Sequence, residues 1–190
     1  MLWRHVTLNT KNSWLPGDER GFRNRDHRIH STGDYKAPPP KHEHAGLRRY
    51  NETGAGDMIE IDAPLRPLVV RAFTTWLLKE HYQVLTVACG ENHLHALVQL
   101  PEALPEVKRI IGICKRQACE AIKHAMTGAT WSANGTYKLI RDQAHQNNTF
   151  DYVSSKQGPG MFVWTYRGEE YWMLQDKVKT PFIAGEFPDF

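Results

Sequence analysis

The sequence predicts an α+β protein in which an antiparallel sheet has helices packed on one face. Two short apolar runs, Tyr82–Cys89 and His93–Leu100, flank the turn-forming tripeptide Gly90-Glu91-Asn92 and predict a β-hairpin. Amphipathic helix patterns precede and follow this hairpin, and an alternating run opens the chain. This order of elements favours a single layered domain over residues 1–190.

The N-terminal part contains one predicted strand and one long loop. Residues Trp3–Thr10 alternate in polarity and are rich in β-forming residues, so they predict the first strand. Residues 20–50 then contain eight Lys or Arg, three Asp or Glu, four His and the tripeptide Pro38-Pro39-Pro40. So few aliphatic side chains cannot form a core, and we expect a basic loop inserted at about 17–57.

Two helices are predicted from apolar residues that recur every three or four positions. The first begins at Asp62 as its N-cap, has Pro64 in its first turn and continues through Leu77. The second covers residues 104–126. Its outward face is basic and carries Lys108, Arg109, Lys115, Arg116 and Lys123.

The C-terminal part adds a strand, a helix and an aromatic tail. Residues 136–142 predict the strand, and the helix is expected to open near Asn147–Thr149 and to stop at Gly158-Pro159. The tail, about 161–190, is rich in Phe, Trp and Tyr, and we expect it to close over the core.

Composition sets broad limits on function. The chain is 41% hydrophobic and 24% charged, with a net charge of +3, which permits a polyanionic partner without requiring one. Three cysteines without Cys-x-x-Cys spacing predict neither a disulfide framework nor a cysteine zinc site. The first ten residues are too polar for a signal peptide and no apolar run is long enough to span a bilayer, so we expect a cytoplasmic protein without a membrane partner.

The stretch "GENHLHALVQLP" places His93 and His95 on one predicted strand. Alternate residues of a strand share a face, so the two Cα atoms lie about 6 to 7 Å apart. Two imidazoles at that spacing suit one metal ion or one phosphate group. Two hydrogen-bonded surface histidines would give the same pattern, so the pair needs further support from the rest of the chain.

Three phosphate chemistries use histidines on strands. The histidine-triad hydrolases need a third histidine at position 97, which is Leu97 here. The two-histidine phosphoesterases need two His-x-Ser/Thr motifs; "HVTL" beginning at His5 fits one, whereas "HLHA" lacks the hydroxyl residue. The HUH nucleases combine a His-hydrophobic-His strand with a tyrosine on a later helix, and "FDYVSSKQG" supplies Tyr152.

The chain resembles the single-tyrosine HUH transposases, which include insertion-sequence transposases and their relatives associated with repetitive extragenic palindromes. The resemblance rests on "WRHVTLNT", "GENHLHALVQLP", "VKRIIGICKRQACEAI" and "YVSSKQ" in this order, and covers about 1–15 and 60–160. It implies a ferredoxin-like antiparallel sheet and a nuclease that acts on single-stranded or hairpin DNA. Tyr152 would be the catalytic nucleophile that forms a 5′-phosphotyrosine bond, with a homodimer as the first expectation.

The resemblance also implies Mg²⁺ or Mn²⁺ held by His93, His95 and a polar residue after the tyrosine. Relatives carry this third ligand four positions after the tyrosine, where this chain has Lys156, which cannot ligate a cation. Gln157 follows one position later. Either the helix ends early and Gln157 turns inward, or the metal site is incomplete.

Two other functions remain open. The first is a transposase-derived protein that binds nucleic acid without cleaving it, and the second is a histidine phosphoesterase that uses His5 and His95. The five basic residues of the second helix suit a DNA backbone, but a solvated helix face has the same composition. Aromatic residues such as Trp131 or Trp164 are candidates for stacking on bases.

Overall fold

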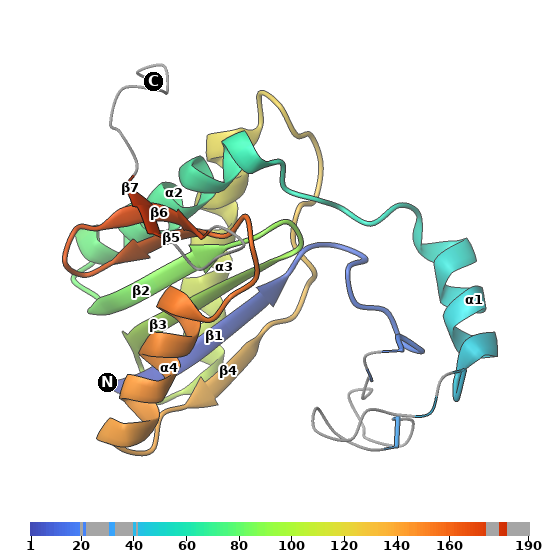
Figure 1. Ribbon diagram of the computed structural model, residues 1–190, viewed down its shortest axis with the longest axis horizontal. Coiled ribbons are helices and arrows are strands. Elements are labelled where there is room, and N and C mark those ends of the chain that lie inside the picture. Colours follow the sequence, from blue (N-terminus) through green and yellow to red (C-terminus); the bar gives the residue numbers. More distant parts are fainter. Residues whose placement is uncertain (20, 22–30, 33–39, 41, 174–178, 182–190) are drawn as a thin grey trace.

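The computed structural model describes residues 1–19, 21, 31–32, 40, 42–173 and 179–181. In this part of the chain seven strands form one antiparallel sheet in the order β4-β1-β3-β2-β5-β6-β7 (Figure 1). The strands are β1 (Leu2–Asn9), β2 (Val84–Cys89), β3 (His93–Leu100), β4 (Thr136–Leu139), β5 (Phe162–Thr165), β6 (Glu170–Met173) and β7 (Lys179–Pro181).

The centre of the domain has the connectivity β1-α2-β2-β3-α3-β4, where α2 is Arg66–Lys79 and α3 is Leu104–Ile122. With the spatial order β4-β1-β3-β2, this is the ferredoxin-like arrangement. It confirms the expected α+β class and antiparallel sheet. The predicted hairpin is β2–β3, with Cys89 opposite Leu94 across the turn.

Helices α2 and α3 pack together on one face of the sheet, as expected. Their apolar stripes include Val69 and Phe73 of α2 and Ile110 of α3, all fully buried. From β3 the alternate residues Leu94, Ala96 and Val98 face this core, and each is fully buried. Complete burial of a large apolar side chain stabilises the fold by roughly 1.5–3 kcal/mol, so this face carries the main core.

A fourth helix, α4 (Gln143–Ser155), lies on the opposite face, against β2, β3 and β5 (Figure 1). The expectation of helices on one face therefore describes α2 and α3 but not α4. Its apolar contact is small and centres on Val153, which joins Ala88 and Val163 in a second buried cluster.

Helix α4 also begins earlier than the sequence pattern indicated. Its N-cap is Asp142, whose Oδ1 accepts a hydrogen bond of 2.7 Å from the backbone N–H of His145. The predicted start near Asn147–Thr149 is wrong because those cap-forming residues lie inside the helix. Tyr152 is therefore in the last turns of an established helix rather than at its start.

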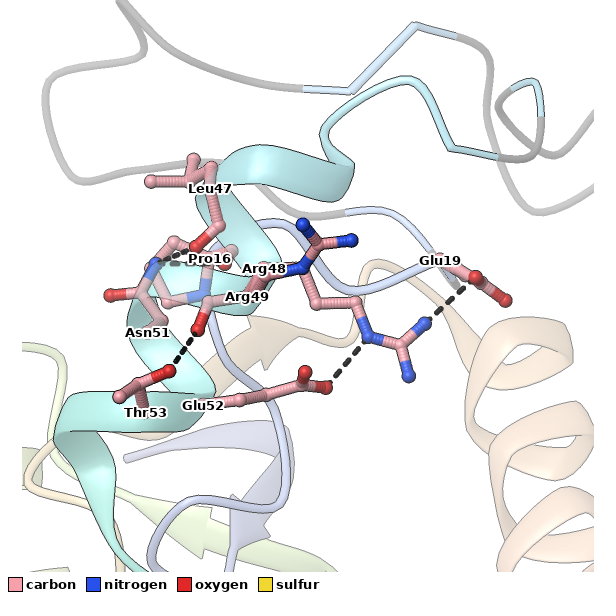
Figure 2. Close-up of polar contacts among 8 residues, drawn as sticks. All are labelled: Pro16, Glu19, Leu47, Arg48, Arg49, Asn51, Glu52 and Thr53. Carbon is pink, nitrogen blue, oxygen red and sulfur yellow. Dashed lines mark hydrogen bonds and ion pairs between the residues drawn. The ribbon is translucent and has the colours of Figure 1, made fainter.

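The predicted basic loop contains a helix, α1 (Ala45–Ala55), which Figure 1 shows apart from the sheet. Arg48 fastens it, as Figure 2 shows, through Nε to Glu52 at 2.7 Å and through Nη1 to Glu19 at 2.8 Å. Asn51 Nδ2 donates to the carbonyl of Pro16 at 3.0 Å. The prediction of a loop without helix is thus wrong here, because α1 is held by polar contacts rather than by an apolar stripe.

The segment between β1 and α2 begins and ends beside the same turn, which connects β2 and β3. Thr10 N–H donates to the carbonyl of Asn92 at 2.9 Å, and Ile61 N–H donates to the carbonyl of Glu91 at 2.6 Å. Both ends of the excursion are thereby fixed to the turn that precedes β3.

The described part of the aromatic tail extends the sheet instead of covering it. Residues 162–165 and 170–173 form β5 and β6, and β5 pairs with β2. Among the described residues, no helix combines the length and the apolarity that a membrane crossing requires.

Candidate active site

The central strands β1 and β3 bring five polar residues to the face that α4 covers. Their register pairs Thr7 with His95 and Asn9 with His93. Residues directly opposite on antiparallel strands project to the same face. His5, two positions before Thr7, shares that face, because side chains alternate along a strand.

His95 is the most enclosed of these residues, with 6% of its surface exposed. Its Nδ1 lies 3.1 Å from His5 Nε2 and 3.1 Å from Thr7 Oγ1. When Nδ1 carries the ring proton, both neighbours can accept it, and Nε2 keeps its lone pair for a ligand. The contacts thus fix the ring and support the tautomer that a ligating histidine needs.

His93 stands beside His95, with 5.0 Å between the ring centroids. Its Nδ1 lies 2.7 Å from Asn92 Oδ1, which accepts hydrogen bonds only. In the neutral ring the proton is therefore on Nδ1, and Nε2 carries the lone pair. Both histidines can then present the same type of donor nitrogen.

Burial keeps two of the imidazoles neutral. It lowers the pKa of His95 to about 3, helped by the nearby His93 and His5. It lowers the pKa of His5 to about 4, helped by the positive charge of Lys138 and by His145. An imidazole must be neutral to act as a metal ligand or a hydrogen-bond acceptor, so both are in the required form near pH 7.

Helix α4 brings Tyr152 to these rings. The tyrosine centroid lies 5.6 Å from that of His95 and 5.9 Å from that of His5, with edge-to-face geometry. Tyr152 is 43% exposed, so the residue is accessible from solvent. Two residues later, the buried carbonyl of Ser154 accepts a 2.5 Å hydrogen bond from Tyr171 Oη, which anchors this end of α4 to β6.

These side chains line one pocket of about 440 Å³. Its walls are polar except for two aromatic rings, and its lining residues are Thr7, Asn9, Ser13, Trp14, Asn92, His93, His95 and Tyr152. The predicted His93, His95 and Tyr152 therefore meet, although more than fifty residues separate the pair from the tyrosine.

Gln157 does not line this pocket. Helix α4 ends at Ser155, so it ends early enough for Gln157 to turn inward, as one of the two alternatives for the third ligand required. The Nε2 of Gln157 instead donates to the carbonyl of Tyr152 at 3.1 Å. Within the described residues, no group of three or more His, Cys, Asp or Glu is placed to hold a metal ion. The histidine pair thus provides two donors, and Gln157 does not supply a third in the described arrangement.

The basic residues predicted on α3 lie away from the pocket, because α3 packs on the other face of the sheet. Lys115 Nζ donates to the carbonyl oxygens of Ser132 and Asn134, and Lys123 forms an ion pair with Glu120. A different cation faces the site. Lys138 of β4 is exposed and pairs in register with His5.

Several pocket residues were missed from the sequence. Thr7 and Asn9 follow from the alternation of β1, once its pairing with β3 is known. No sequence pattern predicts that Trp14 lies in the pocket, because its position depends on the conformation of the loop after β1. Trp131, suggested as a base-stacking residue, is buried at 8% exposure, so that suggestion is wrong. Trp164 is half-buried and packs against the main core.

Comparisons with known proteins give one solved structure and no assignment to a family. No protein-family model matches the chain, and no curated protein does. The structure is described as that of "the REP associates tyrosine transposase bound to a REP hairpin". It aligns with this chain with a TM-score of 0.44 and 12% sequence identity. The alignment covers 80% of this chain and 64% of the transposase, so this chain spans less than two thirds of the length of that protein.

Proposed function

We propose that this protein cleaves and rejoins single-stranded DNA through a covalent bond between Tyr152 and a 5′-phosphate. The main support is the meeting of Tyr152 with His95 and His93 in one solvent-accessible pocket. A phenol beside two imidazoles is the set of groups that the HUH reaction uses. The resemblance in motif order supports the same reading.

The reaction exchanges one phosphoester bond for another. The Tyr152 oxygen bonds to phosphorus while the bond between phosphorus and the 3′ oxygen breaks. The 3′ oxygen takes up a proton and leaves as a hydroxyl, and the phenolic proton passes to solvent. Because the phosphodiester energy is kept in the new bond, a 3′ hydroxyl can reverse the step without ATP.

The donor set suits Mg²⁺ or Mn²⁺ in part. His93 and His95 would hold the ion through Nε2, with phosphate oxygens and water in further positions, as is usual for Mg²⁺. When bound, the ion neutralises charge on the phosphoryl oxygens and stabilises the leaving oxygen. Gln157 would join as a third ligand once its amide leaves the Tyr152 carbonyl.

Mn²⁺ affinity tests this ligand set without any cleavage. Titration followed by electron paramagnetic resonance should show loss of binding in His95→Ala and weaker binding in Gln157→Ala. Gln157→Glu should bind more tightly, because a carboxylate is a better ligand for a hard cation. Wild-type affinity in Gln157→Ala would exclude Gln157 and leave a two-histidine site.

Tyr152 is tested by trapping the covalent product. The protein is incubated with labelled single-stranded oligonucleotides of random sequence and Mn²⁺, and adducts that resist denaturing electrophoresis are counted. We expect adducts in the wild type and in Tyr166→Phe, an exposed control, and none in Tyr152→Phe. Adducts that persist in Tyr152→Phe would contradict the assignment of the nucleophile.

The non-catalytic binding protein is the second candidate. The position of Gln157 favours it, since its amide is bonded to the carbonyl of Tyr152 and, among the described residues, no group of three His, Cys, Asp or Glu is placed to hold a metal ion. Tight oligonucleotide binding by the wild type, with no adduct in Mg²⁺ or Mn²⁺, would establish that function and remove the nuclease.

The contact between His5 and His95 supports the phosphoesterase alternative, but the pKa values of the two histidines argue against it. Histidines that act as general acid and base work best with a pKa near the working pH. Burial instead lowers the pKa of His5 to about 4 and that of His95 to about 3. Hydrolysis that survives Tyr152→Phe and stops in His5→Ala would nevertheless select this alternative.

A single chain supplies both the tyrosine and the histidines of the pocket. A homodimer, the first expectation, is therefore not needed to complete one site. In our proposal a second copy would serve a second cleavage, and a mixture of Tyr152→Phe and His95→Ala chains should not restore adduct formation.

A further inference from the structure

Trp14 forms part of the pocket wall next to Tyr152, His93 and His95. It belongs to the loop that follows β1 and not to the sheet. Of the six tryptophans, Trp14 alone is exposed, at 44%, whereas the other five are buried or half-buried. A large aromatic side chain that is partly exposed and lines a reactive pocket is therefore a candidate binding surface.

The ring is held in place from both sides. Just before it, Ser13 Oγ donates to the carbonyl of Thr10 at 2.9 Å and lies 3.3 Å from that of Asn92, in the turn before His93. The indole Nε1 donates to the carbonyl of Gly21 at 2.8 Å. Because its indole nitrogen is hydrogen-bonded and its neighbour Ser13 is bonded to the turn, Trp14 is held at a fixed position.

The surroundings indicate what would stack on it. The pocket lining also includes short polar side chains, among them Thr7, Asn9 and Asn92. A flat apolar ring beside polar walls suits a flat ligand with hydrogen-bonding edges. A volume of about 440 Å³ lies within the usual range for small-ligand pockets of roughly 300–1,000 Å³.

We infer that Trp14 stacks on a nucleobase of single-stranded nucleic acid, next to the phosphate that Tyr152 attacks. The position of that phosphate rests on the proposed function. Stacking on an aromatic ring is tolerant of sequence, because every base has a π-face. Trp14 would therefore hold the strand at the pocket, while the histidines and Tyr152 act on its backbone.

The test compares two probes in the absence of divalent metal, so that no cleavage is needed. One is a fluorescein-labelled oligothymidylate of about 12 nucleotides, and the other is an abasic strand of the same length. Fluorescence anisotropy gives Kd for each. Trp14→Ala is compared with Trp14→Phe and with Tyr50→Ala, a control at an exposed position of α1 that does not line the pocket.

In Trp14→Ala the oligothymidylate should bind roughly 5- to 150-fold more weakly, whereas the abasic strand should change less than about twofold. Trp14→Phe should recover part of the loss, and Tyr50→Ala should match the wild type. Equal weakening of both probes, or no weakening of either, would overturn the inference. Circular dichroism confirms that each variant is folded.

This outcome is separable from the proposed cleavage. Loss of base discrimination in Trp14→Ala without any adduct in the wild type would keep the stacking surface and remove the nuclease. Adducts that depend on Tyr152, together with unchanged discrimination in Trp14→Ala, would keep the nuclease and remove the stacking surface.

Discussion

Replacing Tyr171 with Phe should loosen the end of α4 that carries the proposed nucleophile. Tyr171 is 3% exposed, and its hydroxyl donates to the carbonyl of Ser154 at 2.5 Å. That carbonyl belongs to the last turn of α4, where carbonyls lack partners within the helix. The substitution keeps the aromatic ring and removes the donor, leaving a buried acceptor without this bond.

Loss of a buried hydrogen bond with one partner left unsatisfied costs about 1–3 kcal/mol. In a domain of 150–250 residues each kcal/mol shifts Tm by about 2–4 °C, so Tm should fall by roughly 2–12 °C. Because Tyr152 precedes Ser154 by two residues, the rate of adduct formation should fall as well.

Thermal unfolding followed by circular dichroism measures the first effect, and single-turnover adduct formation measures the second. Tyr166→Phe is the matched control, because Tyr166 is 52% exposed and should change stability by less than about 0.5 kcal/mol. If Tyr171→Phe unfolds at the wild-type temperature, the anchoring of α4 through this bond is refuted.

Three further predictions concern charge, acid stability and thiol access. In the folded protein the pKa values of His5 and His95 lie below the unfolded value of 6.5, so the unfolded chain binds more protons. The free energy of unfolding should therefore fall as the pH drops from about 6.5 to 4, by up to about 1.4 kcal/mol per pH unit for each histidine. Urea unfolding of His5→Asn should show a weaker dependence of this free energy on pH, and an unchanged dependence would contradict the burial effect. Lys138→Ala should weaken oligonucleotide binding and reduce the slope of log K against log salt concentration by about 0.7. Lys123→Ala, on the other face of the sheet, should change this slope less, and a larger effect of Lys123→Ala than of Lys138→Ala would move the binding face to α3. A thiol reagent should modify Cys119 alone in the folded protein, because the other two cysteines are buried, and rapid reaction of more than one thiol would show an open core.

The main elements follow from the sequence where an apolar pattern defines them. The hairpin around Gly90–Asn92 and helices α2 and α3 were confirmed because their apolar residues face one core. Helix α1 was missed because its described side-chain contacts, which include the ion pairs of Arg48, are polar and leave no apolar period. The start of α4 was misplaced because several residues in a row can act as caps, and only the folded chain selects Asp142.

The candidate site, too, could be predicted from the sequence only in part. The shared face of His93 and His95 follows from strand periodicity, and their approach to Tyr152 agrees with the order of motifs. The contact of His5 with His95 depends on the register between β1 and β3, which local sequence does not specify. Trp14 reaches the pocket through a loop whose path depends on tertiary hydrogen bonds, so no local pattern predicts it.

The excursion from Thr10 to Ile61 has its two ends hydrogen-bonded to adjacent residues of one turn. A segment closed in this way can change in length at little entropic cost, since each doubling of a loop adds only about 0.6 kcal/mol. Trp14 lies inside it, whereas the histidines and Tyr152 lie outside. Under the proposed function, grafting another segment onto the same turn is thus a route to a new preference among nucleic acids that leaves the proposed reacting groups untouched.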